Sequence, residues 1–263
     1  MYRTAAIWVS LSFLALTANV YGETTQKIVD IPTRPGISQR MVVLSPQDPK
    51  AAVILFPGGH GGLQISPSGS FGWGENNFLV RTRMLFADQG LFVAVVDAPS
   101  DRQSPPYLSG FRQKPAHGAD IKAVIAWVRE QAKVPVWLVG TSRGTQSAAY
   151  IATELDGPEG ADGLVLTSTI LTVKKGRPVP AMSIGNLRIP VLVVHHEQDG
   201  CSHCSFNAVP SLMEKLSGAP KSQLLSFKGG QNRGDPCQAL AYHGFNGLDR
   251  EVVGKIANWI LGN

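Results

Sequence analysis

The stretch that decides the fold of this chain is Val136-Trp137-Leu138-Val139-Gly140-Thr141-Ser142-Arg143-Gly144. Its apolar first half predicts a buried strand, and residues 145–155, rich in good helix formers, predict a helix. A strand, a G-x-S-x-G turn and a helix in this order are typical of a nucleophile elbow, in which glycines remove side chains that would collide with the strained turn. Ser142 is therefore the candidate nucleophile, and an ordinary glycine-rich turn is the alternative.

Residues 1–22 have the pattern of a secretory signal peptide. The chain begins Met1-Tyr2-Arg3, continues with an apolar run over residues 5–20, and reaches a small residue at Gly22. The apolar run is short for a membrane span and contains several polar residues, so a retained anchor is the less favoured alternative. We expect cleavage near Gly22, a periplasmic or secreted protein, and no stable membrane insertion after cleavage.

The remaining residues, 23–263, are expected to form a single domain. About 240 residues suffice for one α/β domain with a sizeable core. The formal net charge of +5 is mild, and the basic residues are scattered, so we expect no nucleic-acid partner. Three cysteines in an exported chain predict one disulfide and one remaining thiol. The oligomeric state is not indicated by the sequence.

Short apolar runs alternate with amphipathic segments along the chain. We expect strands at residues 40–44, 51–56, 91–96, 136–139, 163–167, 190–195 and 224–227. We expect helices at residues 77–89, 118–133, 145–155 and 249–261. This alternation predicts an α/β protein with a doubly wound, mainly parallel sheet. No long helical insertion precedes residue 190, so we expect little or no lid and an open site.

A serine becomes a good nucleophile when a histidine takes its proton and an acid holds that histidine in one tautomer. After an elbow the expected chain order is serine, acid, histidine. The strand at 190–195 runs into Glu197, Asp199 and Gly200. Asp199 is preferred to Glu197 because a short side chain at the turn with Gly200 can project back toward a histidine. A simple turn aspartate is the alternative.

His243 is the preferred base among the six histidines of the chain. It alone lies between the last predicted strand and the last predicted helix, and Gly244 gives its loop the freedom to place the imidazole over Ser142. We interpret His195 and His196 as supporting residues, because they end a strand next to the acid. A histidine on a surface loop is the alternative interpretation of His243.

These features together resemble the α/β-hydrolase fold over about residues 53–261. The resemblance rests on the glycine-rich loop from Pro57, Val95-Val96-Asp97, the elbow, residues 190–196 with Asp199, and His243-Gly244-Phe245. More narrowly, the chain resembles small exported bacterial hydrolases of the dienelactone-hydrolase-like group, through His195-His196, Asp199, Gly200-Cys201, and Gly234-Asp235-Pro236-Cys237 ahead of His243. Dienelactone hydrolases proper use a cysteine nucleophile, so their substrate is not carried over to Ser142.

The resemblance also implies an oxyanion hole. Pro57-Gly58-Gly59 occupies the place where lipases and esterases carry His-Gly-Gly, so the N–H of Gly59 is the implied donor and that of His60 the second choice. The N–H of Arg143, directly after the serine, is the other implied donor. A flexible glycine-rich loop without a role is the alternative.

The cysteines fit the same arrangement. Cys201 follows the acid and Cys237 precedes the histidine, so a Cys201–Cys237 disulfide would tie the two loops together and leave Cys204 free. In the chain-entropy model such a loop closure stabilises by about 3–4 kcal/mol. A Cys204–Cys237 bond is the second choice. A metal or redox role for Cys201-Ser202-His203-Cys204 is a further alternative, although a second ligand pair is lacking.

The sequence thus predicts a serine hydrolase that acts on carboxylic esters of a small-molecule acyl substrate, with no cofactor and no metal. Thioesters and amides use the same machinery, and the acyl and alcohol groups are not indicated. A non-catalytic binding protein on the same fold is the alternative, because a fold does not fix a function. That alternative predicts a missing or misplaced triad member, whereas this chain carries all three in order.

Overall fold

The computed structural model describes residues 24–173 and 176–263, so the signal peptide predicted at residues 1–22 lies outside the described residues. One sheet has the strand order β1-β2-β4-β3-β5-β6-β7-β8. Its strands are β1 (Thr25–Arg34), β2 (Ile37–Ser45), β3 (Ala51–Phe56), β4 (Leu91–Pro99), β5 (Val136–Thr141), β6 (Gly163–Thr167), β7 (Val191–His196) and β8 (Ser222–Phe227). At one edge β1 pairs antiparallel with β2, and β2 pairs antiparallel with β4. The strands from β3 to β8 run parallel to one another. The predicted mainly parallel sheet is confirmed.

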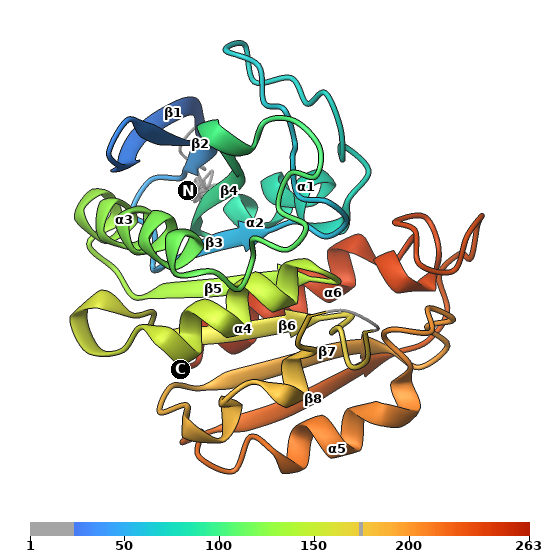
Figure 1. Ribbon diagram of the computed structural model, residues 1–263. Helices are drawn as coiled ribbons and strands as arrows, with labels where there is room; N and C mark the ends of the chain where they lie inside the picture. Colours follow the sequence, from blue (N-terminus) through green and yellow to red (C-terminus); the bar gives the residue numbers. More distant parts are fainter. Residues whose placement is uncertain (1–23, 174–175) are drawn as a thin grey trace, which may run out of the picture.

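Helices cover both faces of this sheet (Figure 1). Their bounds are α1 (Phe78–Arg81), α2 (Arg83–Asp88), α3 (Pro115–Ala132), α4 (Gly144–Glu154), α5 (Val209–Glu214) and α6 (Asp249–Leu261). Apolar residues of α3, α4 and α5 pack on one face, and those of α1, α2 and α6 pack on the other. The sheet is therefore doubly wound, as predicted.

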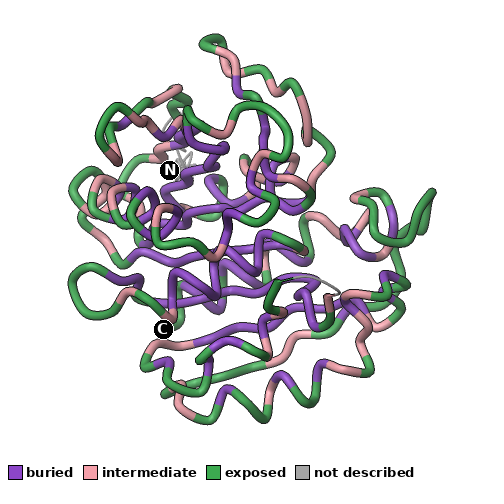
Figure 2. The backbone as a smooth tube through the Cα atoms, viewed as in Figure 1, coloured by how far each residue is buried: buried purple, intermediate pink, exposed green. Residues whose placement is uncertain are grey.

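The two apolar layers leave the central strands without solvent contact. Every residue of β3, β5, β6 and β7 is buried, and Figure 2 shows this buried centre with exposed residues gathered in the outer loops. Continuous apolar sequence is what such strands require, because both of their faces meet helices. The carboxyl ends of the parallel strands point in the same direction, and the loops that follow β3, β5, β7 and β8 meet there.

Some elements differ from the sequence-based expectation. Strand β1 was not predicted, because most of its residues are at least partly exposed and it lacks an apolar pattern. The helix expected at residues 77–89 is interrupted at Thr82, whose hydroxyl donates to the carbonyl of Phe78 at 2.6 Å. Helix α3 begins earlier than expected, at Pro115, since proline is well suited to the first turn of a helix. The short helix α5 was also missed.

The described residues between β6 and β7 form only short 3₁₀ turns, at Val179–Ala181 and Ile184–Asn186. The expectation of little or no lid is confirmed in this part of the chain. Across residues 24–173 and 176–263, none of the helices combines the length and the apolar character needed to cross a membrane.

Asp97, in the buried strand β4, fixes the loop that follows β3. Its carboxylate accepts backbone N–H groups of Leu63 at 2.6 Å, Gln64 at 3.2 Å and Ile65 at 2.9 Å, and also that of Ala98 at 2.7 Å. Backbone donors in a buried loop need such an acceptor, because water cannot replace it. One carboxylate therefore holds the far end of the glycine-rich loop against the sheet.

We expect Asp97→Ala to lower the free energy of unfolding by about 2–4 kcal/mol, because buried N–H groups lose their acceptor. Urea denaturation followed by circular dichroism measures this change. Asp88→Ala, which removes an exposed carboxylate at the end of α2, is the matched control and should change stability by less than about 0.5 kcal/mol. Equal effects of the two substitutions would contradict the role given to Asp97.

Candidate active site

Ser142 lies on the turn between β5 and α4 with a backbone φ of 52°. A non-glycine residue with positive φ is uncommon and strained, and here hydrogen bonds hold it. The N–H of Ser142 donates to the carbonyl of Thr167 at 3.0 Å, and the Thr145 hydroxyl donates to the carbonyl of Ser142 at 2.6 Å. A Cβ on Gly144 would lie 2.0 Å from the carbonyl oxygen of Phe56, so only glycine fits there. The geometry is that of a nucleophile elbow.

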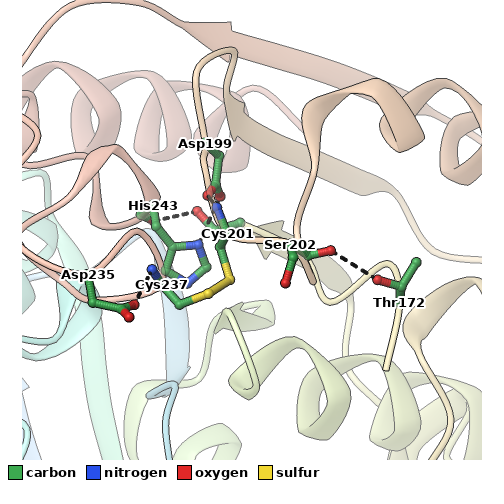
Figure 3. The surroundings of a disulfide bond; sticks show 8 residues. Thr172, Asp199, Cys201, Ser202, Asp235, Cys237 and His243 are labelled. Carbon is green, nitrogen blue, oxygen red and sulfur yellow. Dashed lines mark hydrogen bonds and ion pairs between the residues drawn. A yellow bond between two sulfur atoms is a disulfide. The ribbon is translucent and has the colours of Figure 1, made fainter. Parts of the chain in front are cut away.

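Asp199 and His243 meet although 44 positions separate them in the sequence. Asp199 follows β7, and His243 lies in the 3₁₀ turn Tyr242–Gly244 between β8 and α6. The Oδ2 of Asp199 lies 2.8 Å from the Nδ1 of His243, and both side chains are buried (Figure 3). The other carboxylate oxygen of Asp199 accepts the N–H of Cys201 at 2.9 Å. With Nδ1–H donated to Asp199, Nε2 is the nitrogen left to act as a base.

Ser142 and His243 line the same cleft, which we call the serine cleft; Gly58, Gly59, Arg143 and His203 are also in its wall. Its volume is about 750 Å³. Among the described residues, Nε2 of His243 has no hydrogen-bond partner, and no hydrogen bond joins it to the Ser142 hydroxyl. Bonds of this kind are often long before a substrate binds. Nε2 is therefore free to receive a proton inside the cleft that Ser142 also lines.

The loop after β3 packs directly on the candidate nucleophile. A Cβ on Gly58 would lie 3.0 Å from the Cβ of Ser142, and Gly59 has a φ of +57° that favours glycine. Within the described parts of the chain, the N–H groups of Gly59 and Arg143 donate to no acceptor. Two unpaired N–H groups beside a candidate nucleophile could bind a developing oxyanion.

Solved structures similar to this chain share its arrangement of strands and helices. An esterase from Pyrococcus furiosus matches with a TM-score of 0.64 and 13% identity, over 90% of this chain and 92% of that one. A dienelactone hydrolase from Anabaena variabilis matches with 0.64 and 14%, over 91% and 98%. A serine hydrolase without a lid from Xanthomonas campestris matches with 0.54 and 16%, over 89% and 95%. No protein-family model matches the chain, and no curated protein does.

This chain has the α/β-hydrolase fold.

Several residues that the sequence did not single out support the candidate site. Arg112, in the segment between β4 and α3, donates to the carbonyls of Pro57 at 3.0 Å and Gly59 at 3.4 Å. The Ser168 hydroxyl donates to the carbonyl of His243 at 2.6 Å. No sequence pattern marks either residue, because each acts on a segment distant in the sequence.

His60, considered above for its N–H, also has a packing role in the fold. Its imidazole lies between the rings of Trp73, at 3.8 Å between centroids, and Tyr107, at 4.3 Å. Its Nδ1 accepts the N–H of Gly62 at 3.1 Å. Burial lowers the pKa of His60, with the charge of Arg112 as the second cause. The aromatic stack therefore helps to hold the loop that contains Gly59.

His195 and His196 are supporting residues, as interpreted from the sequence. The Nε2 of His195 accepts the N–H of Thr169 at 2.9 Å. The ring of His196 stacks on that of Tyr242 at 4.4 Å, and its Nε2 lies 2.9 Å from the carbonyl of Gly229. His196 thus links the end of β7 to the loop that carries His243.

The predicted Cys201–Cys237 disulfide is present, with 4.6 Å between the Cα atoms. Figure 3 shows it beside the imidazole of His243, joining the loop of Asp199 to that of His243. Cys204 is free and buried, and burial raises the pKa of its thiol. The sulfurs of Cys201 and Cys204 lie within 4.8 Å of a ring nitrogen of His243, but the disulfide occupies one of them. Too few donors remain for a structural zinc site.

We expect one thiol to react in denatured, unreduced protein and three after reduction, because two of the three cysteines are paired. Titration with a chromogenic disulfide reagent counts them. The matched control Cys204→Ala should give none before reduction and two after it. The double variant Cys201→Ser, Cys237→Ser should lose about 3–4 kcal/mol of stability. Three reactive thiols before reduction would rule out the disulfide and reopen the metal interpretation.

Two buried histidines should make the stability of this protein depend on pH. Burial lowers the pKa of His195 to about 4 and that of His117 to about 3, the latter with help from the charge of Arg112. Unfolded histidine titrates near 6.5, so below this pH the unfolded chain binds protons that the folded chain does not. The free energy of unfolding therefore has its full value above about pH 6.5, and it decreases as the pH drops toward 4.

We expect urea midpoints to fall steadily from pH 7 to pH 4, with His195 alone contributing up to about 3 kcal/mol. His117→Gln should show a shallower fall, because glutamine does not titrate. His203→Gln changes a histidine that is only partly buried and serves as the control; its profile should parallel the parent protein. A stability that does not vary across this range would show that the two histidines titrate alike in the folded and the unfolded chain.

Proposed function

We propose that this protein is a serine hydrolase that cleaves carboxylic esters with Ser142, His243 and Asp199. One observation carries the proposal: Ser142, on a strained elbow, shares a cleft with His243, whose Nδ1 lies 2.8 Å from the carboxylate of Asp199. A hydroxyl, an imidazole with an unpaired Nε2 and a buried acid in this order are the components of nucleophilic acyl transfer. A structural role alone would not require the strained φ of Ser142.

In the proposed reaction the Ser142 oxygen attacks the ester carbonyl carbon while Nε2 of His243 takes the hydroxyl proton. Asp199 holds the ring orientation and stabilises the imidazolium. The tetrahedral intermediate then expels the alcohol, which receives the proton from Nε2, and an acyl-enzyme remains on Ser142. Water, deprotonated by His243, attacks this acyl group and releases the acid, so the enzyme returns to its starting state.

The oxyanion of both intermediates is proposed to accept the N–H groups of Gly59 and Arg143. Neither group donates elsewhere among the described residues, and the packing of Gly58 on Ser142 keeps the two donors close to the nucleophile. Arg112 and the stacked ring of His60 support this loop from behind. Donors that are fixed before the reaction stabilise developing charge without reorganisation.

Esters are the proposed substrates because the site has little lid and because the structurally similar proteins include an esterase and other hydrolases. Thioesters and amides could react through the same groups. We further propose a small-molecule acyl substrate, no cofactor, and a periplasmic or secreted location. The location rests only on the sequence of residues 1–22.

We expect a fluorophosphonate probe to label the folded protein at Ser142, because the probe reacts with activated serines. Ser142→Ala and His243→Ala should each abolish labelling and ester turnover, with thermal unfolding close to that of the parent protein for Ser142→Ala. His203→Ala and Asp235→Asn are the matched controls, since both residues line the serine cleft outside the proposed triad. The controls should retain labelling.

Peptide mapping of the labelled protein identifies the modified residue. Labelling elsewhere, or an active Ser142→Ala variant, would overturn the assignment. Well-folded protein that takes up no probe would favour the alternative of a non-catalytic binding protein on this fold.

A further inference from the structure

A second cleft, about 870 Å³ in volume, adjoins the serine cleft. The two share Gly59, Arg143 and His203 in their walls, so the second cleft begins beside the proposed oxyanion donors. Its far wall is the segment from Leu108 to Lys114, ahead of α3. We call it the cationic cleft, for the reason given next.

Three cations and no acid line the cationic cleft. The cations are Arg112, Lys114 and Arg143, and none of the described lining residues is an aspartate or a glutamate. Among the described residues, none of the three takes part in an ion pair. Cations that gather in a concave wall without counter-ions attract an anion.

Arg112 is the strongest indication that the cationic cleft binds an anion. Its side chain is buried, with a residue exposure of 5%, and its hydrogen bonds to the described residues go to neutral acceptors: the Ser147 hydroxyl at 2.9 Å and the carbonyls of Pro57 and Gly59. Burial and, as the second cause, the charge of Arg143 together lower the pKa of Arg112 to about 9. A buried charge without a partner is costly, and a bound anion would offset that cost.

The serine cleft has the opposite charge on its outer wall. It is lined by Glu75 and Asp235, both exposed, in addition to the proposed catalytic groups. The substrate-binding surface therefore changes from cationic to acidic across Ser142. An ester bound over Ser142 would place its two halves in clefts of different charge.

The proposed chemistry decides which half enters which cleft. The leaving alcohol takes its proton from His243, so it must lie on the His243 side, in the serine cleft. His243 does not line the cationic cleft, whereas Arg143 lines both. The acyl chain, bonded to Ser142 and directed away from His243, therefore extends into the cationic cleft.

We propose that the substrate carries a carboxylate on its acyl chain, so that the protein cleaves monoesters of short dicarboxylic acids. Arg143 and Arg112 would face this carboxylate, and Lys114 would add a weaker attraction at the exposed rim. Charge-assisted hydrogen bonds from arginine to carboxylate are strong and directional. This inference rests on the proposed ester hydrolysis at Ser142, but it adds a specificity that ester hydrolysis does not require.

A matched pair of substrates tests the inference: the mono-4-nitrophenyl ester of glutaric acid, and the same compound with its free carboxylate blocked as a methyl ester. Leaving group and chain are the same, so the two substrates differ in the charge and in one methyl group. We expect kcat/KM to be about tenfold or more higher for the charged ester, mainly through a lower KM. Sodium chloride should raise the KM of the charged ester and leave that of the blocked ester unchanged.

Variants are compared by the ratio of the two kcat/KM values, which cancels any general effect on catalysis. Arg143→Gln keeps the backbone N–H but removes the guanidinium, and it should bring the ratio close to one. Lys114→Gln should lower the ratio a few-fold. Lys255→Gln removes an exposed cation on α6, away from both clefts, and should leave the ratio unchanged.

The inference is overturned if the blocked ester is as good a substrate as the charged one, or if Arg143→Gln and Lys114→Gln leave the preference intact. Either result is compatible with ester hydrolysis at Ser142, which would then stand without this specificity. Failure of the proposed function would look different: neither ester would be hydrolysed, and Ser142 would not react with a fluorophosphonate.

Discussion

The close approach of three backbone segments is the constraint on which the site depends. The turn after β5 lies so near the end of β3 that a Cβ on Gly144 would meet the carbonyl oxygen of Phe56 at 2.0 Å. This contact lets Ser142 adopt its positive φ and brings the Gly58–Gly59 loop against it. A larger residue at 144 would push α4 away from the end of β3. The unpaired N–H groups of Gly59 and Arg143 would then no longer lie beside Ser142, the proposed nucleophile. The strained backbone of Ser142 is maintained because the buried strands β5 and β3, which end next to it, fix its position.

The second half of the site is assembled from loops that the sheet alone would not hold together. Asp199 and His243 follow different parallel strands, and the turn that carries His243 is joined to the Asp199 loop by the Cys201–Cys237 disulfide and by the Asp199–His243 hydrogen bond. Ser168, directly after β6, adds a third attachment through the carbonyl of His243. A covalent link reduces the freedom of the unfolded chain, and the hydrogen bonds select one orientation of the imidazole. Because the bonds come from loops that follow neighbouring strands, a small shift of the sheet would move the imidazole of His243, the proposed base.

Arg112 connects the organisation of the site to its electrostatics. It holds the carbonyls of Pro57 and Gly59, and so positions the proposed oxyanion donors, and it also lines a cleft that has no acid among its described lining residues. A neutral donor could make the same hydrogen bonds without the penalty of burying a charge. A guanidinium at this position is therefore better explained if it both holds the loop after β3 and, as proposed, attracts an anion. Asp97 has a comparable structural task at the other end of the loop, where four N–H groups converge on one carboxylate.

The sequence by itself determined the elements whose signals are local. Apolar runs such as residues 51–56 and 190–195 predict the buried strands, the glycines around Ser142 predict the elbow, and chain order selects Asp199 and His243 as partners. The tertiary structure decided what depends on distant neighbours. Strand β1 forms because β2 offers it unpaired backbone groups, Arg112 and Ser168 gain their roles from loops far along the chain, and the separation of charge across Ser142 arises only when four loops converge. Periodicity records which face of an element is buried, but it carries no information about which other segment will cover that face.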